Sequence, residues 1–146
     1  MASSSNVLLL LLMTAGLILT SLPSTTPANH LVIRQYMPPG FSLNYQNQYI
    51  FEMRNDCNAA FREVNSPDPI WQTYINFDGP KERCHLKIRI NCNIVILSEY
   101  GGIVLWESQT QLTSDGATHC FIEITENATL YDGAARNKLW VNGNKV

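Results

Sequence analysis

The chain has 146 residues, with 10 lysines and arginines against 12 aspartates and glutamates, which leaves a formal net charge of −2. All of these charges lie after residue 28 and the two signs are interspersed. This distribution argues against nucleic acid as a partner and against an anionic membrane surface, since both require clustered positive charge.

Residues 1–28 carry no charged side chain, and their apolar stretch ends in Leu22–Ala28, which is rich in proline, serine and threonine. This pattern predicts a secretory signal peptide cleaved near Ala28. An uncleaved membrane anchor is the alternative, but the apolar run is shorter than the ~20 residues needed to cross a bilayer. We therefore expect one secreted, extracellular domain over residues 29–146, with no membrane insertion of the mature chain.

Short strand-like segments recur between turn signals after residue 28. In chain order they are Leu31–Tyr36, Tyr49–Cys57, Ile70–Phe77, Cys84–Cys92, Asn93–Leu97, Ile103–Ser108, Cys120–Ile124, Leu130–Gly133 and Leu139–Val141. A bend is expected near Asn91–Asn93, and no internal repeat is apparent. The one helix-like patch, Asn58–Val64, allows a single turn at most. We predict an all-β fold, a small antiparallel β-sandwich of about seven or eight strands stapled by disulfides.

The segment Cys84–Cys92 alternates without a break between apolar and polar residues, which is typical of a half-buried strand. Such a strand would place both cysteines in the core, roughly 26 Å apart at about 3.3 Å per residue. A disulfide requires Cα atoms within about 7 Å, so the pair Cys84–Cys92 is excluded. With Cys57 and Cys120, two other pairings remain open.

No motif for catalysis or metal binding is present, and we expect a non-enzyme without cofactor or metal. The histidines His30, His85 and His119 lack the paired spacing of metal ligands. His119 and Cys120 are adjacent, so on a strand they would point to opposite faces. A pair of carboxylates that meet only in the fold would make a small secreted hydrolase, which is the weaker alternative.

Tryptophans and a sequon are the other features of interest. Trp71 and Trp106 alternate along their predicted strands on the same side as apolar neighbours, so we expect them in the core. For Trp140, the sequence does not determine which side of its strand the ring occupies. Solvent-facing aromatic residues would instead stack on sugars, as in a cell-wall carbohydrate-binding module, which is the main alternative function. Asn127 begins the sequon Asn127-Ala128-Thr129 and is the predicted glycosylation site.

Several of these features have a counterpart in one known family. Cys57 ends a strand, Cys92 follows 35 positions later, and Cys120 opens an alternating strand that precedes Leu130–Gly133 and a closing Trp140. In this order of elements the chain resembles the plant self-incompatibility S-protein family, the secreted S-protein homologues.

The resemblance implies a secreted signalling or recognition ligand that binds a cell-surface receptor protein. Characterised members of the family act in pollen–pistil rejection. Loops would then carry the contacts, and the candidates are Met37–Asn44, Asn65–Asp68, Gly101–Gly102 and Asp115–His119. The resemblance and its spacing also favour Cys57–Cys92 with Cys84–Cys120 as the disulfides.

Overall fold

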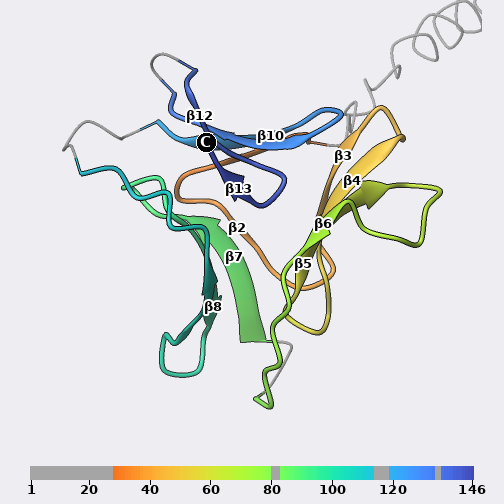
Figure 1. The fold of residues 1–146 in the computed structure, drawn as a ribbon. Helices are drawn as coiled ribbons and strands as arrows, with labels where there is room; N and C mark the ends of the chain where they lie inside the picture. The colour runs from red at the N-terminus through yellow and green to blue at the C-terminus, as the bar shows by residue number, and fades with distance from the viewer. Residues whose placement is uncertain (1–27, 80–82, 114–118, 134–135) are drawn as a thin grey trace, which may run out of the picture.

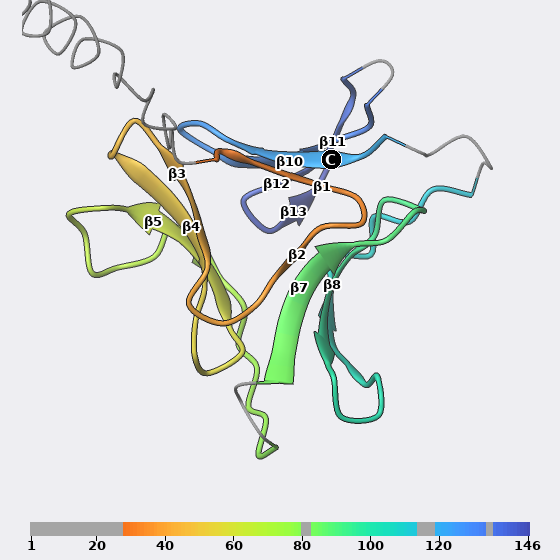
Figure 2. The same cartoon turned by 180° about the vertical axis from the view of Figure 1, so that it is seen from behind.

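The computed structural model describes residues 28–79, 83–113, 119–133 and 136–146. Their strands form three antiparallel sheets, and no α-helix occurs among these residues. Figures 1 and 2 show the sheets as the three sides of a prism around a common core. The predicted all-β fold is confirmed, but the predicted sandwich is wrong, because the strands divide among three sheets instead of two layers.

Each sheet is named here by its position along the chain. Sheet I has the strand order β3 (Ser42–Tyr45), β4 (Tyr49–Met53), β5 (Ala59–Glu63), β6 (Trp71–Gln72). Sheet II has the order β2 (Tyr36–Met37), β7 (Cys84–Ile88), β8 (Ile94–Ser98), β9 (Val104–Glu107). Sheet III has the order β1 (His30–Val32), β10 (Phe121–Ile124), β11 (Ala128–Tyr131), β12 (Lys138–Val141), β13 (Asn144–Lys145).

The first three strands belong to three different sheets. β1 pairs with β10 in sheet III, β2 with β7 in sheet II, and β3 with β4 in sheet I. This segment, orange in Figure 1, therefore visits all three sides of the prism in turn. Sheets II and III thus each join an early strand to a hairpin far along the chain, whereas in sheet I β3 forms a hairpin with β4, which follows it directly.

One tryptophan from each sheet points toward the centre of the prism, where Trp71 contacts both of the others. Trp71, Trp106 and Trp140 lie on β6, β9 and β12, at intervals of 35 and 34 residues. The Trp71 ring centroid lies 5.5 Å from that of Trp106 and 4.9 Å from that of Trp140, both edge to face. Trp71 and Trp106, which were expected in the core, are partly buried and pack against it, and Trp140 is 1% exposed. The even spacing reveals a threefold repeat that sequence divergence conceals.

The alternating segment that includes β7 does not form one continuous strand. β7 ends at Ile88, and a turn reverses the chain into β8 as the expected bend. In this turn the Cys92 N–H donates to the Arg89 carbonyl and the Arg89 N–H to the Asn93 carbonyl, both at 2.9 Å. Ile90 shares the apolar side of the alternation with the two cysteines, but it lies in the turn and is 72% exposed. Hydrogen bonding of the turn therefore overrides the apolar pattern.

Three other elements differ from the prediction. The helix-like patch Asn58–Val64 instead holds β5, whose Ala59, Ala60 and Phe61 are buried against both neighbouring strands. Only Trp71–Gln72 of the expected aromatic strand pairs in a sheet. β3 falls where a loop was expected, and its buried residue is Leu43. In each case pairing with the neighbouring strands of sheet I decides the conformation.

The four cysteines form two bridges, Cys57–Cys84 with Cα atoms 5.8 Å apart and Cys92–Cys120 with Cα atoms 5.5 Å apart. Disulfide bonding of all four and the absence of a Cys84–Cys92 bridge agree with the prediction. The favoured pairing, Cys57–Cys92 with Cys84–Cys120, is wrong.

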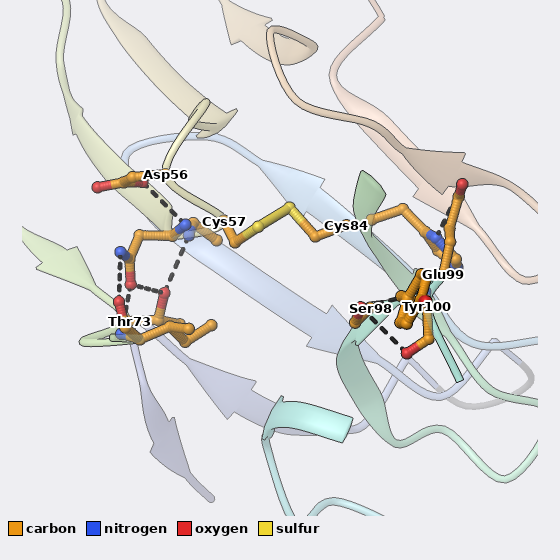
Figure 3. Close-up of a disulfide and its surroundings, with 11 residues drawn as sticks. Asp56, Cys57, Thr73, Cys84, Ser98, Glu99 and Tyr100 are labelled. Carbon is orange, nitrogen blue, oxygen red and sulfur yellow. Dashed lines mark hydrogen bonds and ion pairs between the residues drawn. A yellow bond between two sulfur atoms is a disulfide. The ribbon is translucent and has the colours of Figure 1, made fainter. Parts of the chain in front are cut away.

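The observed disulfide pairing follows from the threefold repeat of the sheets. Cys57 and Cys92 occupy equivalent turns, with φ of 70° and 69°, and each turn lies beside the first cysteine of the next sheet. Figure 3 shows the Cys57–Cys84 bridge reaching from the turn after β4, beside Asp56, to the start of β7, near Glu99. Each bridge therefore joins two neighbouring sides of the prism.

The predicted signal peptide lies outside the described residues except for Ala28, whose carbonyl accepts a hydrogen bond from the Asn44 N–H at 3.2 Å. The domain boundary at residue 28 stays a prediction. In the described part of the chain, no helix has the length and apolar character needed to span a membrane.

Candidate functional site

The outward side of each sheet is the surface on which a ligand would contact this fold, because the inward side is packed around the tryptophans. Each outer face lies beside the same kind of turn. The side chain of Asp56, Asn91 or Thr125 accepts a hydrogen bond from the N–H two residues later, at 2.9, 3.2 and 3.4 Å respectively. The three turns thus share one plan with different side chains.

In two of these turns, a buried asparagine uses its side-chain amide to hold neighbouring segments of the chain together. The Asn58 Oδ1 accepts hydrogen bonds from the Thr73 hydroxyl at 2.9 Å and the Ile75 N–H at 2.6 Å. The Asn93 amide donates to Glu107 at 2.8 Å, and its Oδ1 accepts from the Ser108 hydroxyl at 3.1 Å. Both asparagines are buried. Their polar atoms hold adjacent chain segments and are not available to a ligand.

The outer face of sheet I is occupied by its own charges. Glu52 pairs with Arg62 at 3.0 Å and with Arg54 at 3.2 Å, and Arg54 also donates to the side-chain Oε1 of Gln72 at 2.9 Å. Ala60, between Glu52 and Gln72 in the register, is 0% exposed. Burial raises the pKa of Glu52, but hydrogen bonds from Arg62 and Arg54 outweigh it, so its pKa lies below the usual 4.5.

We expect acid to weaken the fold through two groups. Because the pKa of Glu52 is lower in the folded chain, its ion pairs stabilise the fold above pH 4.5, and this is lost as the pH falls through the folded-state pKa. The pKa of His85 also lies below its usual 6.5, because burial and Lys87 disfavour the cation more than Glu99 favours it. Stability should therefore begin to fall already below about pH 6.5.

Glu52→Gln tests the acidic part of this dependence. The variant should lose roughly 1 kcal/mol of stability at pH 7, since two arginines lose a partly buried carboxylate partner. It should also show a flatter stability profile below pH 4.5. Urea unfolding between pH 3 and pH 8 measures both effects, with the exposed Glu63→Gln on the neighbouring strand as the matched control. Parallel profiles for Glu52→Gln and the parent would contradict the assignment.

Aromatic and charged side chains also cover one another on the outer face of sheet III. The rings of Phe121 and Tyr131 stack at 5.3 Å, and the Arg136 guanidinium lies 5.4 and 5.0 Å from their centroids. Arg136 also pairs with Glu123 at 2.9 Å, and His30 lies 3.5 Å from the same carboxylate. The polar groups of this face are thus largely engaged with each other.

The outer face of sheet II contains a hollow of about 480 Å³. Two other hollows in the described part of the chain, of about 450 and 300 Å³, lie along β1 to β3 and beside Glu52 and Arg54 of sheet I. We call the first the sheet II hollow, and its lining comes from the β1–β2 connection, from β2, and from β7 with the following turn. The residues are Arg34, Gln35, Tyr36, His85, Lys87, Ile88, Arg89, Ile90 and Asn91. A volume of this size lies within the range of sites for small molecules.

Pairing of β2 with β7 brings the aromatic and cationic parts of the hollow together. Tyr36 lies opposite Lys87 in the register and is 63% exposed. Its ring meets His85 edge to face at 5.7 Å. Because the pKa of His85 is lowered, its imidazole is neutral at pH 7. The hollow therefore offers an open tyrosine ring beside amide and cationic hydrogen-bond donors.

This chemistry suits binding and not catalysis. An aromatic ring beside planar amides and charged donors can hold a sugar, with the ring against its C–H face and the donors on its hydroxyl groups. No group of three or more histidine, cysteine or acidic residues could hold a metal ion in the part of the chain that the structure describes.

The sequence-based candidates do not gather at one place. His30 lies on sheet III and His85 in the sheet II hollow, while His119 directly precedes the bridged Cys120. The candidate loops Met37–Asn44, Asn65–Asp68 and Gly101–Gly102 do not line the hollow, and residues 115–118 of the fourth loop lie outside the described residues. Asn127 is exposed in the turn after β10, where its Oδ1 accepts a hydrogen bond from the Asn142 amide at 2.7 Å. Its glycosylation stays a prediction.

Part of the hollow was visible in the sequence. His85, Lys87 and Arg89 form the polar side of the alternation, and the structure places all three in the hollow. The sequence analysis missed Tyr36, because only the pairing of β2 with β7 brings it there.

No known family profile matches the chain. A mannose-specific lectin from Narcissus pseudonarcissus is 37% identical over 70 residues, which are 48% of this chain and 60% of the lectin. A mannose-specific lectin from Narcissus tazetta is 36% identical over 70 residues, or 47% of its length. The chain thus spans at most 60% of the curated relatives that it matches.

Solved structures extend the likeness over most of the chain. Monomeric monocot mannose-binding lectins from Gastrodia elata superpose with a TM-score of 0.66 and 28% identity, over 82% of this chain and 100% of theirs. The mannose-specific agglutinin of snowdrop, Galanthus nivalis, has a TM-score of 0.58 at 24% identity, over 81% of this chain and 98% of its own. The snowdrop protein shares the fold.

These comparisons correct the family assignment. The proteins that the chain resembles are lectins, so the resemblance to S-proteins is wrong, and the self-incompatibility assignment goes with it. A receptor protein as partner loses its support for the same reason. The expectation of a non-enzyme agrees with the comparisons, because lectins are binding proteins.

Proposed function

We propose that the protein is a secreted lectin that binds mannose-containing glycans through the sheet II hollow. The observation that carries the proposal is the likeness to the Gastrodia elata mannose-binding lectins over the whole length of those chains. This is the carbohydrate-binding alternative drawn from the sequence, in which a solvent-facing aromatic residue contacts the sugar. The tryptophans pack around the prism axis, and Tyr36 supplies the solvent-facing ring.

Three features of the outer faces support this location. On sheet I the arginines are paired with Glu52, and on sheet III Arg136 covers the aromatic rings. Sheet II combines an open ring with a hollow of suitable size. We include secretion in the proposal because residues 1–28 are predicted to be a signal peptide.

The direct test is binding of the protein, secreted from eukaryotic cells, to an array of neutral and acidic glycans that includes mannan and high-mannose glycoproteins. Retention on mannose-containing glycans, reversed by free mannose or by α-mannosides, supports the proposal. Absence of binding to every glycan on the array would overturn it, and turnover of any glycan would favour the hydrolase alternative.

Tyr36→Ala should weaken glycan binding by about tenfold, because a sugar would lose its stacking surface in the hollow. Titration calorimetry with a mannose oligosaccharide measures the change. Tyr74→Ala is the matched control, since Tyr74 is 86% exposed and does not line the hollow. Equal affinity of the Tyr36→Ala variant and the parent would place the sugar elsewhere on the protein.

A further inference from the structure

The charge of the sheet II hollow is unusual for this molecule. Its lining includes three cations, Arg34, Lys87 and Arg89, and no acidic residue. The chain as a whole carries a net charge of −2, so this local excess runs against the average. A concentration of one sign of charge around a hollow attracts ligands of the opposite sign.

Within the described part of the chain, none of these three cations takes part in an ion pair or a side-chain hydrogen bond. The outward arginines of the other two sheets behave differently. Arg54 and Arg62 are held by Glu52, and Arg136 is held by Glu123. The hollow therefore has cationic donors that the fold leaves unneutralised.

One carboxylate lies next to the lining. Glu99 approaches His85 at 3.6 Å, and its side chain is more than half exposed to solvent. Because the pKa of His85 is lowered, its imidazole does not neutralise Glu99, which therefore offsets one positive charge beside the hollow. The three cations remain in excess even with Glu99 counted.

Geometry places the cations around the hollow and not along a flat surface. Lys87 and Arg89 alternate on the outward side from β7 into its turn, about 6.6 Å apart along the strand direction. Arg34 comes from the β1–β2 connection, where its φ of 71° holds the chain in a tight turn. An anionic group in the hollow can therefore be approached from two chain segments.

We propose that the sheet II hollow selects glycans that carry an anionic group, such as a uronate carboxylate or a phosphate or sulfate ester. The inference rests on the proposed function, because it assigns a ligand class to the same site. Tyr36 and the amides of Gln35 and Asn91 contact the neutral part of the sugar, while Arg34, Lys87 and Arg89 bind the anion.

The experiment compares neutral mannan, phosphorylated mannan, polygalacturonate and a sulfated polysaccharide at physiological salt, with inorganic phosphate as a competitor. The parent protein should bind at least one acidic glycan about tenfold more tightly than mannan. This preference should shrink as salt is raised, since partly exposed charges are screened. The glycan that binds best identifies the anion.

A double variant, Lys87→Gln with Arg89→Gln, should lose the preference for acidic glycans. The matched control is Lys138→Gln with Lys145→Gln, which removes the same charge from exposed positions on sheet III. Thermal unfolding confirms that both variants are folded. Arg34→Asn provides a second, independent charge removal, because asparagine tolerates a positive φ better than most residues.

The outcomes separate the inference from the proposed function. Equal or stronger binding of neutral mannan overturns the anionic preference and leaves the lectin function standing. An equal loss of preference in the control variant also overturns the inference, because net charge and not the hollow would then be responsible. Displacement of acidic glycans by inorganic phosphate at equal concentration would mark a simple anion site and overturn it too. Failure to bind any glycan contradicts the lectin proposal itself.

Discussion

Replacement of Trp71 with alanine is expected to lower the free energy of unfolding by about 3–5 kcal/mol. Trp71 is the one tryptophan that contacts both others, and its ring also stacks on Phe51 with centroids 6.2 Å apart and planes within 3°. Gly143 of sheet III passes so close to the indole that a Cβ there would collide with it. Removal of this ring would therefore open a cavity at the point where the three sheets meet.

Guanidinium unfolding followed by circular dichroism measures this loss. Trp71→Phe is the graded control, since it retains an aromatic ring and should lose less stability than the alanine variant. Tyr74→Ala removes a large, exposed ring from the same segment and should change stability by less than about 0.5 kcal/mol. A loss no larger for Trp71→Ala than for Tyr74→Ala would contradict the packing of the three tryptophans around one centre.

Removal of the Cys57–Cys84 bridge by a double alanine variant should destabilise the fold by about 3.5 kcal/mol. The chain-entropy estimate depends on the length of the closed loop, and the two bridges have sequence separations of 27 and 28. Loss of the Cys92–Cys120 bridge should therefore cost about the same. Each loss is large for a domain whose total stability is expected to be about 5–15 kcal/mol.

A comparison of double cysteine variants tests which cysteines are bonded to each other. In the structure, Cys57→Ala with Cys84→Ala removes one bridge and leaves no free thiol, whereas Cys57→Ala with Cys92→Ala breaks both bridges and frees two thiols. The pairing favoured by the sequence predicts the reverse. Thiol titration of the denatured variants, together with peptide mapping of the non-reduced parent, distinguishes the two arrangements. Two free thiols in the Cys57–Cys84 variant would refute the structural pairing.

Local pattern was sufficient for several features of the fold. The alternation in Tyr49–Cys57 predicted the buried Phe51 and Met53, and Trp71 and Trp106 were expected in the core because they follow apolar neighbours in phase. Four cysteines in a chain with a predicted leader indicated two disulfides. These features depend on residues within one strand or on a count, so neighbouring residues carry the information.

The errors arose where backbone hydrogen bonds to other residues outweigh the pattern of apolar and polar side chains. Asn58–Val64 becomes β5 because β4 and β6 pair with it on both sides. Ile90 is apolar but lies in a turn, because the hydrogen bonds of that turn end β7 before it. The S-protein resemblance rested on cysteine spacing, which the threefold repeat of the prism also produces.

The amino-acid sequence by itself determined the all-β class, the bridging of all four cysteines, and the polar side of β7 that faces the sheet II hollow. The tertiary structure decided the number of sheets, the partner of each cysteine, and the position of Tyr36 beside Lys87. The physical reason is the range of the interactions. Alternation of side chains is a property of one strand, whereas the prism forms through pairing of β1 and β2 with strands far later in the chain.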